Sequence, residues 1–219
     1  MDILQPENAM QVHLIRHAES EANTKPGYFG VYDPPLTARG RDQAERLGDC
    51  LQRNGLQPGY FASSDLMRAH STATIVTTRL AGIGYEIHLS QDLREIHRGD
   101  WTGRSIEEVK NENPDLWAQF SDGDLDFTPP GGESMRTVGL RMMKAFNLAV
   151  SKMSDQGIEH GMIVSHGRAI GAFHALYSGC RPEVGWRYII HNTSITTFEY
   201  HLKHGWGIRR LNSTPHLGL

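Results

Sequence analysis

Gln11-Val12-His13-Leu14-Ile15-Arg16-His17-Ala18-Glu19-Ser20 has the pattern of a buried strand that runs into a polar turn. Its first five residues have the length and the branched apolar side chains of such a strand. The polar run begins where the strand ends. Because ligands bind beyond the carboxyl ends of the strands in parallel sheets, this stretch predicts both a strand and the place of a functional site.

Segments of strand length alternate with segments of helical period along the rest of the chain. The predicted strands are residues 11–15, 59–63, 84–89, 161–165, 194–200 and 206–211. The predicted helices run from near Thr37 to Gly55, from 65 to 80, from 134 to 153 and from 168 to 178, with a short helix after Ser105 that Pro114 interrupts. This alternation predicts an α/β fold of three layers, α/β/α, around a mostly parallel central sheet.

The composition is that of a globular chain. With 219 residues, 38% hydrophobic and 21% charged, it can bury one large core, and the lack of linkers and repeats predicts a single domain over residues 1–219. No apolar run approaches the length of about 18 residues that spans a membrane, and the first ten residues do not resemble a signal peptide. We therefore expect a cytoplasmic protein without a membrane partner.

Charge and cysteine content narrow the expected partners. A formal net charge of −3 gives no reason to expect nucleic acid or an anionic membrane. Cys50 and Cys180 are too few for a disulfide framework, and we expect both to be reduced and at least half-buried. The sequence indicates no oligomeric state.

Polar residues follow three other predicted strands in the same way as the first. The second strand ends in Ser63-Ser64-Asp65, with Arg68 one turn into the next helix. Glu95 follows the third strand, and Ser165-His166-Gly167 ends the fourth. Two histidines, two arginines and a carboxylate are therefore expected to meet at one edge of the sheet.

These residue types suit phosphoryl transfer. Arginines offer forked donors that match phosphate oxygens, and a neutral imidazole such as that of His17 is a competent nucleophile. Glu95 could protonate the leaving oxygen and then take a proton from water. Because no aspartates cluster at the strand ends as they do in Mg²⁺ sites, we expect neither a metal ion nor another cofactor.

Other interpretations of the same residues stay open at this point. His17 and His166 could be buried structural histidines, and Arg68 alone could be a surface arginine. Glu95 has nearby competitors for the role of proton donor, namely Glu86, Glu107 and Glu108.

Six ordered blocks of the chain resemble the histidine phosphatase superfamily, which also contains the cofactor-dependent phosphoglycerate mutases. They extend over residues 12 to about 200. The blocks are Arg16-His17-Ala18-Glu19-Ser20 with Asn23, Leu36-Thr37-Ala38-Arg39-Gly40, Ser63-Ser64-Asp65 with Arg68, Ala69 and Thr72, Glu95 with Gly99 and Trp101, Gly131-Gly132-Glu133-Ser134, and Ser165-His166-Gly167.

The resemblance implies a role for each matched residue. His17 is the expected phosphorylated nucleophile and Glu95 the expected proton donor, with His166, Arg16 and Arg68 completing the catalytic set. The expected substrate-binding residues are Arg16, Asn23, Arg68, His166 and Gly167. The implied partner is a small phosphorylated substrate.

Departures from the mutases favour the phosphatase branch of the family. Mutases usually have a tyrosine three residues after the acid and a lysine further on, where this chain has Arg98 and Ile106. The stretch from Asn111 to Gly132 contains no Lys or Arg, and residues of about 105–133 resemble the lid of the phosphatases. We expect a metal-independent phosphomonoesterase of the histidine acid phosphatase type; a mutase or a non-catalytic scaffold is the alternative.

The same segment suggests a substrate preference. It carries Asp115, Asp122, Asp124 and Asp126 among aromatic residues. An acidic and aromatic lid is expected to favour a leaving group without further negative charge. We also expect kcat/KM to fall on the acid side as His17 is protonated, and to change between pH 5 and pH 8.

Overall fold

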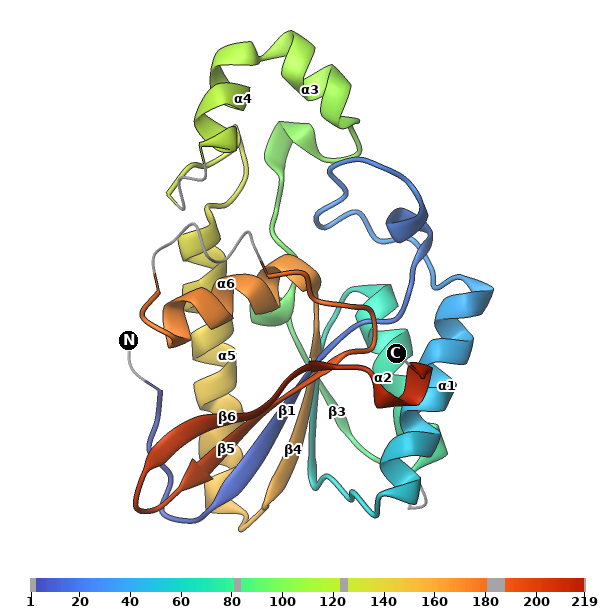
Figure 1. Cartoon of the computed structure of the whole chain (residues 1–219), viewed down its shortest axis with the longest axis vertical. Helices are drawn as coiled ribbons and strands as arrows, with labels where there is room; N and C mark the ends of the chain where they lie inside the picture. Colours follow the sequence, from blue (N-terminus) through green and yellow to red (C-terminus); the bar gives the residue numbers. More distant parts are fainter. Residues whose placement is uncertain (1–2, 81–83, 123–125, 181–187, 219) are drawn as a thin grey trace.

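The computed structural model, which describes residues 3–80, 84–122, 126–180 and 188–218, has a central sheet with helices on both faces (Figure 1). The strands are β1 (Met10–Arg16), β2 (Tyr60–Ser64), β3 (Ile87–Ser90), β4 (His160–Ser165), β5 (Ile195–His201) and β6 (Gly205–Ser213). The α-helices are α1 (Ala38–Arg53), α2 (Met67–Arg79), α3 (Ile106–Glu112), α4 (Pro114–Ser121), α5 (Met135–Asp155) and α6 (Gly167–Tyr177). The predicted fold class is confirmed.

The sheet is mostly parallel, as expected. Its strands lie in the order β3-β2-β4-β1-β5-β6, and β5 runs antiparallel to both of its neighbours. The parallel register of β1 and β4 sets Arg16 beside Ser165. His17 and His166 therefore leave the sheet from adjacent positions on neighbouring strands.

Helices α1 and α2 pack on one face of the sheet, and α5 and α6 pack on the other. The predicted apolar face of the long helix is buried, with Met135, Val138, Met142, Phe146, Ala149 and Met153 in the core. Six apolar residues at helical spacing fix the orientation of α5 against the sheet. Both faces are covered, which is why the central strands are almost continuously apolar.

Side-chain caps start several helices where the sequence predicts them. The hydroxyl of Thr37 accepts a hydrogen bond from the amide of Gly40 at 2.9 Å. Ser105 and Glu108 form the reciprocal capping box expected at the start of α3. Pro114 ends α3 and occupies the first turn of α4, where its missing N–H costs nothing. The expected interruption is therefore also the start of a second short helix.

Two expectations about local structure are wrong. The third strand begins at Ile87 instead of residue 84, because its partner strand β2 begins only at Tyr60 and the ladder pairs Ile87 with Phe61. Both cysteines are free, but Cys180 is exposed, whereas Cys50 is buried as expected. Cys180 follows the end of α6, beyond the part of the helix that packs on the core.

Helices α3 and α4 lie beyond the edge of the sheet at which β1 and β4 end (Figure 1). Trp117 and Phe120 of α4 attach this segment to Tyr28 through ring contacts with centroids 6.2 and 5.8 Å apart. Trp101, which is 1% exposed, belongs to the same aromatic cluster through its contacts with Tyr28 and Phe120. No helix among the described residues is both long and apolar enough to cross a membrane.

Candidate active site

His17 lies directly after β1, and its imidazole is held in one orientation. Its Nδ1 is 2.7 Å from the main-chain oxygen of Ala18, and its Nε2 is 3.3 Å from the Nε of Arg68. The carbonyl can only accept and the guanidinium can only donate. The network therefore assigns the proton to Nδ1 and leaves the lone pair on Nε2.

The surroundings of His17 keep it uncharged. Burial lowers its pKa well below the usual range, and the positive charges of Arg68 and Arg16 lower it further. A neutral imidazole that carries its lone pair on Nε2 has the protonation state that a nucleophile requires.

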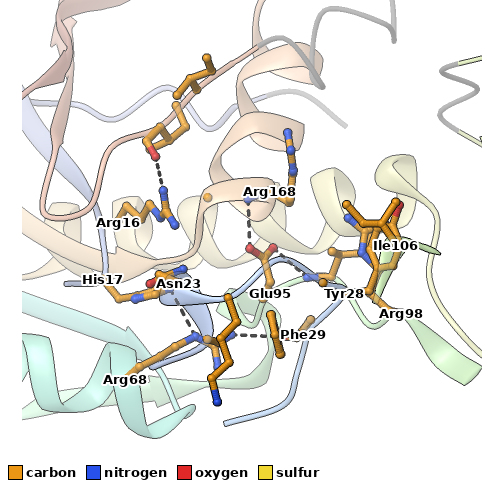
Figure 2. Close-up of a pocket in the computed structure, with 18 of the residues that line it drawn as sticks. Arg16, His17, Asn23, Tyr28, Phe29, Arg68, Glu95, Arg98, Ile106 and Arg168 are labelled. Carbon is orange, nitrogen blue, oxygen red and sulfur yellow. Dashed lines mark hydrogen bonds between the residues drawn. The ribbon is translucent and has the colours of Figure 1, made fainter. Parts of the chain in front are cut away.

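Arg68 is 3% exposed, so it is not a surface arginine. Besides its contact with His17, it donates hydrogen bonds to the main-chain oxygens of Tyr32 and Gly30 at 2.7 and 2.8 Å. It also lies 3.4 Å from the carboxylate of Asp33. These contacts fix the guanidinium beside the Nε2 of His17 (Figure 2).

Arg16 reaches the same place from the other side of His17 (Figure 2). Its Nη1 donates to the main-chain oxygen of Ile190. Its buried Nε has no hydrogen-bond partner among the described residues. The guanidinium passes over Gly167, where an added Cβ would stand 3.3 Å from the Nε of Arg16. The predicted residue Gly167 therefore makes room for Arg16.

His166 lies at the start of α6 with its ring centroid 4.9 Å from that of His17. It is fully buried and is not among the residues that line the pocket. Neither ring nitrogen has a hydrogen-bond partner within the described part of the chain. Burial, followed by the charge of Arg68, lowers its pKa well below the usual range. A buried ring whose nitrogens lack partners, next to the expected nucleophile, can offer a hydrogen bond to an incoming oxygen.

Glu95 is held at the N-terminus of α6. Its Oε1 accepts hydrogen bonds from the amides of Ile96 and Ala169 at 2.9 and 3.1 Å, and its Oε2 accepts one from the amide of Arg168 at 3.1 Å. Three fixed donors hold the carboxyl group in the same pocket as His17.

The three other glutamates considered for the role of proton donor do not line the pocket. Glu86 is paired with His88 at 3.6 Å. Glu108 caps α3 and Glu107 is exposed on that helix. His97, which also does not line the pocket, accepts a hydrogen bond from the amide of Gly99.

Asn23 lines the pocket with its amide oriented by neighbours. Its Oδ1 accepts from the amide of Ser20 at 3.0 Å and from the Nδ2 of Asn192 at 3.3 Å. This network leaves the Nδ2 of Asn23 available as a donor. Asn192 also donates to the main-chain oxygen of His17 at 2.9 Å. Asn192 could not be predicted from the sequence, because it lies in a loop with no chemical motif.

The residues described above open onto a pocket of about 650 Å³. Aromatic and aliphatic side chains also line it, including Tyr28, Phe29, Ile106, Phe120, Tyr188 and Ile189. Three basic residues that were not predicted as site residues also line it, namely Lys25, Arg98 and Arg168. Two of these positions gave a weak indication of the site in the sequence, since Arg98 follows Glu95 by three residues and Arg168 follows His166-Gly167. Within the described ranges, no group of three or more His, Cys, Asp or Glu is arranged to hold a metal ion.

This geometry agrees with the comparison to known families. A family model described as the histidine phosphatase superfamily (branch 1) matches residues 12–214. The chain belongs to this superfamily. The resemblance to this superfamily that the sequence motifs indicated is thereby confirmed.

Relatives in this superfamily include both mutases and phosphatases by name. A protein of Salmonella paratyphi B named "Probable phosphoglycerate mutase GpmB" is 32% identical over 212 residues, which is 95% of each chain. The alpha-ribazole phosphatase of Shigella flexneri is 27% identical, with a TM-score of 0.80 over 94% of this chain and 97% of that one. A mycobacterial glucosyl-3-phosphoglycerate phosphatase is 26% identical, with a TM-score of 0.78 over 94% and 100%.

Proposed function

We propose that the chain hydrolyses phosphomonoesters through a phosphohistidine formed on His17. The observation that carries this proposal is the hydrogen-bonding state of His17. Its Nδ1–H donates a hydrogen bond to the carbonyl of Ala18, and its Nε2 accepts one from the Nε of Arg68. Burial beside two arginines keeps the ring neutral, so the nucleophile needs no separate base.

In the first step, Nε2 of His17 attacks phosphorus and the bond from phosphorus to the ester oxygen breaks. Arg16 and Arg68 hold the equatorial oxygens, on which charge accumulates in the transition state. We assign to His166 and Asn23 further hydrogen bonds to the same phosphoryl group. The carboxyl group of Glu95 gives its proton to the leaving alkoxide, which departs as the alcohol.

In the second step, Glu95 takes a proton from water while the water oxygen attacks the phosphorus. The N–P bond breaks, its electron pair returns to Nε2, and inorganic phosphate is released. One carboxyl group serves both steps because it changes protonation state between them. The three amide donors on Glu95 fix the carboxyl group in place for both.

We also propose that residues 1–219 act as one domain and that residues 105–133 form a lid over the site. Ile106 and Phe120 support this, because both come from this segment and both line the pocket. Closing such a segment over the pocket would exclude water during the first step.

A phosphoglycerate mutase reaction is the second candidate, favoured by the 32% identical relative that is named a probable phosphoglycerate mutase. It requires a phosphoenzyme that survives against water and returns its phosphoryl group to substrate. The absence of Lys and Arg from residues 111–132 supports hydrolysis instead. Conversion of 3-phosphoglycerate to the 2-isomer with a bisphosphoglycerate primer, without release of phosphate, would favour the mutase.

The proposal is tested by measuring phosphate release from a panel of phosphomonoesters in EDTA. The panel includes p-nitrophenyl phosphate, and the proteins are the wild type, His17→Ala and the control His70→Ala. His70 is an exposed histidine of α2, so its variant should keep the fold while it also loses one imidazole. Activity in the wild type and control that disappears in His17→Ala is expected. Equal activity in all three proteins would contradict the proposal, and no activity in any would favour the mutase or a non-catalytic scaffold.

A further inference from the structure

The aspartates of the proposed lid do not reach the pocket. Asp115, Asp122 and Asp126 are exposed, and none of the three lines the pocket. Asp124 lies outside the described residues. The described aspartates therefore do not support the expected preference for a leaving group without negative charge. At the end of the same segment, Glu133 instead contacts the loop that contains the proposed proton donor.

Arg141 of α5 uses all five N–H donors of its guanidinium group. Its Nε donates to Oε1 of Glu133 at 2.9 Å, and its Nη2 donates to Oε2 of Glu133 at 3.0 Å and to the main-chain oxygen of Glu95 at 3.1 Å. Its Nη1 donates to the main-chain oxygens of Asp92 and Arg94 at 3.0 and 2.6 Å. Because these five donors have fixed directions in one plane, the contacts set the position of the loop relative to α5.

The main-chain oxygens of four consecutive residues, 92–95, each accept a hydrogen bond from a side chain. Arg141 donates to three of them. The hydroxyl of Ser165, at the end of β4, donates to the fourth, which is the oxygen of Leu93, at 2.8 Å. Side chains here take over part of the role that a helix or sheet ladder has elsewhere. The path of the chain into Glu95 is therefore set by α5 and β4.

Glu133 holds the chain directly after Glu95. Its Oε2 accepts a hydrogen bond from the amide of His97 at 2.9 Å, and its own amide donates to the oxygen of His97 at 2.9 Å. Burial raises the pKa of Glu133, but hydrogen bonds from Arg141 and from the amide of His97 outweigh burial and lower it. Glu133 is therefore a carboxylate at neutral pH, and its ion pair with Arg141 persists there.

The carboxyl group of Glu95 has to meet donors that belong to another element. The amides of Arg168 and Ala169, at the start of α6, donate to it at 3.1 Å each (Figure 2). A shift of the loop would separate the carboxyl group from these amides, because α6 is not part of the loop. Arg141 does not line the pocket, so any contact that it has with the reaction is indirect.

Arg141 has a second possible influence on the site through its charge. Burial is the main cause of the low pKa of His166, and nearby positive charges, that of Arg141 included, lower it further. The charge belongs to any cation at this position, whereas the five directed hydrogen bonds need a guanidinium group. A lysine in place of Arg141 therefore separates the two influences.

We propose that Arg141, together with Glu133, is a positioning residue that holds Glu95 where it can protonate the leaving oxygen. This inference rests on the proposed function, because it concerns the proton donor of that reaction. Without the contacts of Arg141, the loop is free to shift, and the carboxyl group no longer meets the leaving oxygen in the required geometry.

Two substrates with different leaving groups measure the help that Glu95 gives. Phenol has a pKa of about 10, like the tyrosine side chain, so phenyl phosphate needs protonation of its leaving oxygen. The p-nitrophenolate ion is a far weaker base, so p-nitrophenyl phosphate needs little help. The informative quantity is kcat/KM for phenyl phosphate divided by kcat/KM for p-nitrophenyl phosphate. It reports on the first step, because kcat/KM does not include the later hydrolysis of the phosphoenzyme.

Arg141→Gln is expected to lower kcat/KM for phenyl phosphate about tenfold to a hundredfold, and that for p-nitrophenyl phosphate less than about threefold. Arg141→Lys should lower the ratio nearly as much, because three donors on a flexible stem cannot replace the five. An equal loss for both substrates in Arg141→Gln would show a purely structural role. Full recovery of the ratio in Arg141→Lys would show that only the charge matters. Either result would overturn the proposal.

Lys144→Gln is the matched control. Lys144 is an exposed cation of the same helix, and its Nζ lies 2.8 Å from the carboxylate of Asp92 in the same loop. This contact is made to a side chain and not to the main chain next to Glu95. The ratio of the control should equal that of the wild type. A loss in Lys144→Gln as large as that in Arg141→Gln would contradict a specific role of Arg141.

Glu133→Gln provides a second variant in case Arg141→Gln does not fold. It removes the charge of the carboxylate and keeps its shape, so the ratio should fall about tenfold. The double variant with Arg141→Gln should lose little more, because residues that act as a unit are not additive. Additive losses would contradict a joint role of the two residues.

NMR of the amides of Arg168 and Ala169 separates this inference from the proposed function, because it needs no turnover. Both amides donate to Glu95. In Arg141→Gln, their resonances are expected to move toward their positions in Glu95→Ala, with faster hydrogen exchange. If the wild type hydrolyses phosphomonoesters while the ratio and both resonances of Arg141→Gln stay as in the wild type, the positioning role fails and the phosphatase proposal stands. If the wild type releases no phosphate and both resonances still move, the phosphatase proposal fails and Arg141 still holds Glu95 in place.

Discussion

The Nε of Arg68 lies 3.3 Å from the Nε2 of His17, so a guanidinium donor meets the lone pair of the expected nucleophile directly. This contact has two consequences. It opposes protonation of His17, because a second proton on the ring would face a fixed positive charge. It also marks the position that a phosphoryl group has to enter, between the imidazole and the guanidinium.

The first prediction concerns the protonation of His17. Its pKa lies well below 6.5, so NMR of ¹⁵N-imidazole-labelled protein, assigned with His17→Ala, should show no His17 midpoint near pH 6.5. The fall of kcat/KM caused by His17 should lie at more acidic pH. A profile that is flat from pH 5 to pH 8 is therefore compatible with the proposed role, contrary to the expectation from sequence. A midpoint at the ordinary value of a free histidine would contradict the electrostatic account.

Gly167→Ala tests the position of Arg16. The added Cβ would stand 3.3 Å from the Nε of Arg16, so the guanidinium has to give by a few tenths of an ångström. We expect kcat/KM to fall by about tenfold to a hundredfold with little change in Tm, because small misplacement at a reacting centre is costly. Gly207→Ala is the matched control, since a Cβ there meets nothing within 4 Å. Equal activity of the two variants would show that Arg16 does not need this space.

Asn192 is expected to be a positioning residue, because it binds the main-chain oxygen of His17 and the side chain of Asn23. Asn192→Ala should lower kcat about tenfold. The control is Asn54→Ala, which removes a comparable side-chain hydrogen bond to the main-chain oxygen of Cys50 at 2.8 Å, far from the site. Both variants should lose similar stability in urea, but only Asn192→Ala should lose turnover. A loss of stability without a loss of kcat would limit Asn192 to a structural role.

Buried histidines should make stability depend on pH. His174 is 1% exposed, and burial lowers its pKa to about 4. Above pH 6.5 the ring is neutral in both the folded and the unfolded chain. Between pH 6.5 and about 4 the unfolded chain binds the proton and the folded chain does not. The free energy of unfolding therefore decreases as the pH is lowered through this range.

The variant His174→Leu should reduce this dependence. Over the same pH window, the slope of the free energy of unfolding against pH should decrease by up to about 1.4 kcal/mol per pH unit. Urea unfolding at several pH values measures this slope, with His70→Ala as the control. His13, whose pKa is also lowered to about 4 by burial and by His160, acts in the same direction and remains in both variants. An unchanged slope in His174→Leu would mean that this ring is protonated in the folded protein.

The parts of the site that could be predicted from the sequence are those attached directly to strand ends. His17 and His166 follow strands that are neighbours in register, so their positions in the sequence almost determine their positions in space. Glu95 was predicted with competitors, and only the approach of its loop to the N-terminus of α6 separates it from them.

The parts that could not be predicted depend on how loops and short helices turn. Asn192 reaches His17 across a chain separation of 175 residues. The role of the acidic segment depended on which side of α4 faces inward. Trp117 and Phe120 pack against Tyr28, which leaves Asp115 exposed. These aromatic contacts set the rotation of α4 about its own axis. The positions of the charged residues in the sequence are not enough to predict it.

The most direct test of the phosphohistidine on His17 is a burst experiment with Glu95→Gln and p-nitrophenyl phosphate. This substrate has a good leaving group, so the first step should need little help from an acid, whereas water attack still lacks its base. We expect rapid release of one p-nitrophenol per active site, slow turnover afterwards, and an acid-labile, base-stable phosphate on the peptide that contains His17. The double variant that also carries His17→Ala should show no burst. A burst that persists without His17, or labelled phosphate on another residue, would contradict the proposed mechanism.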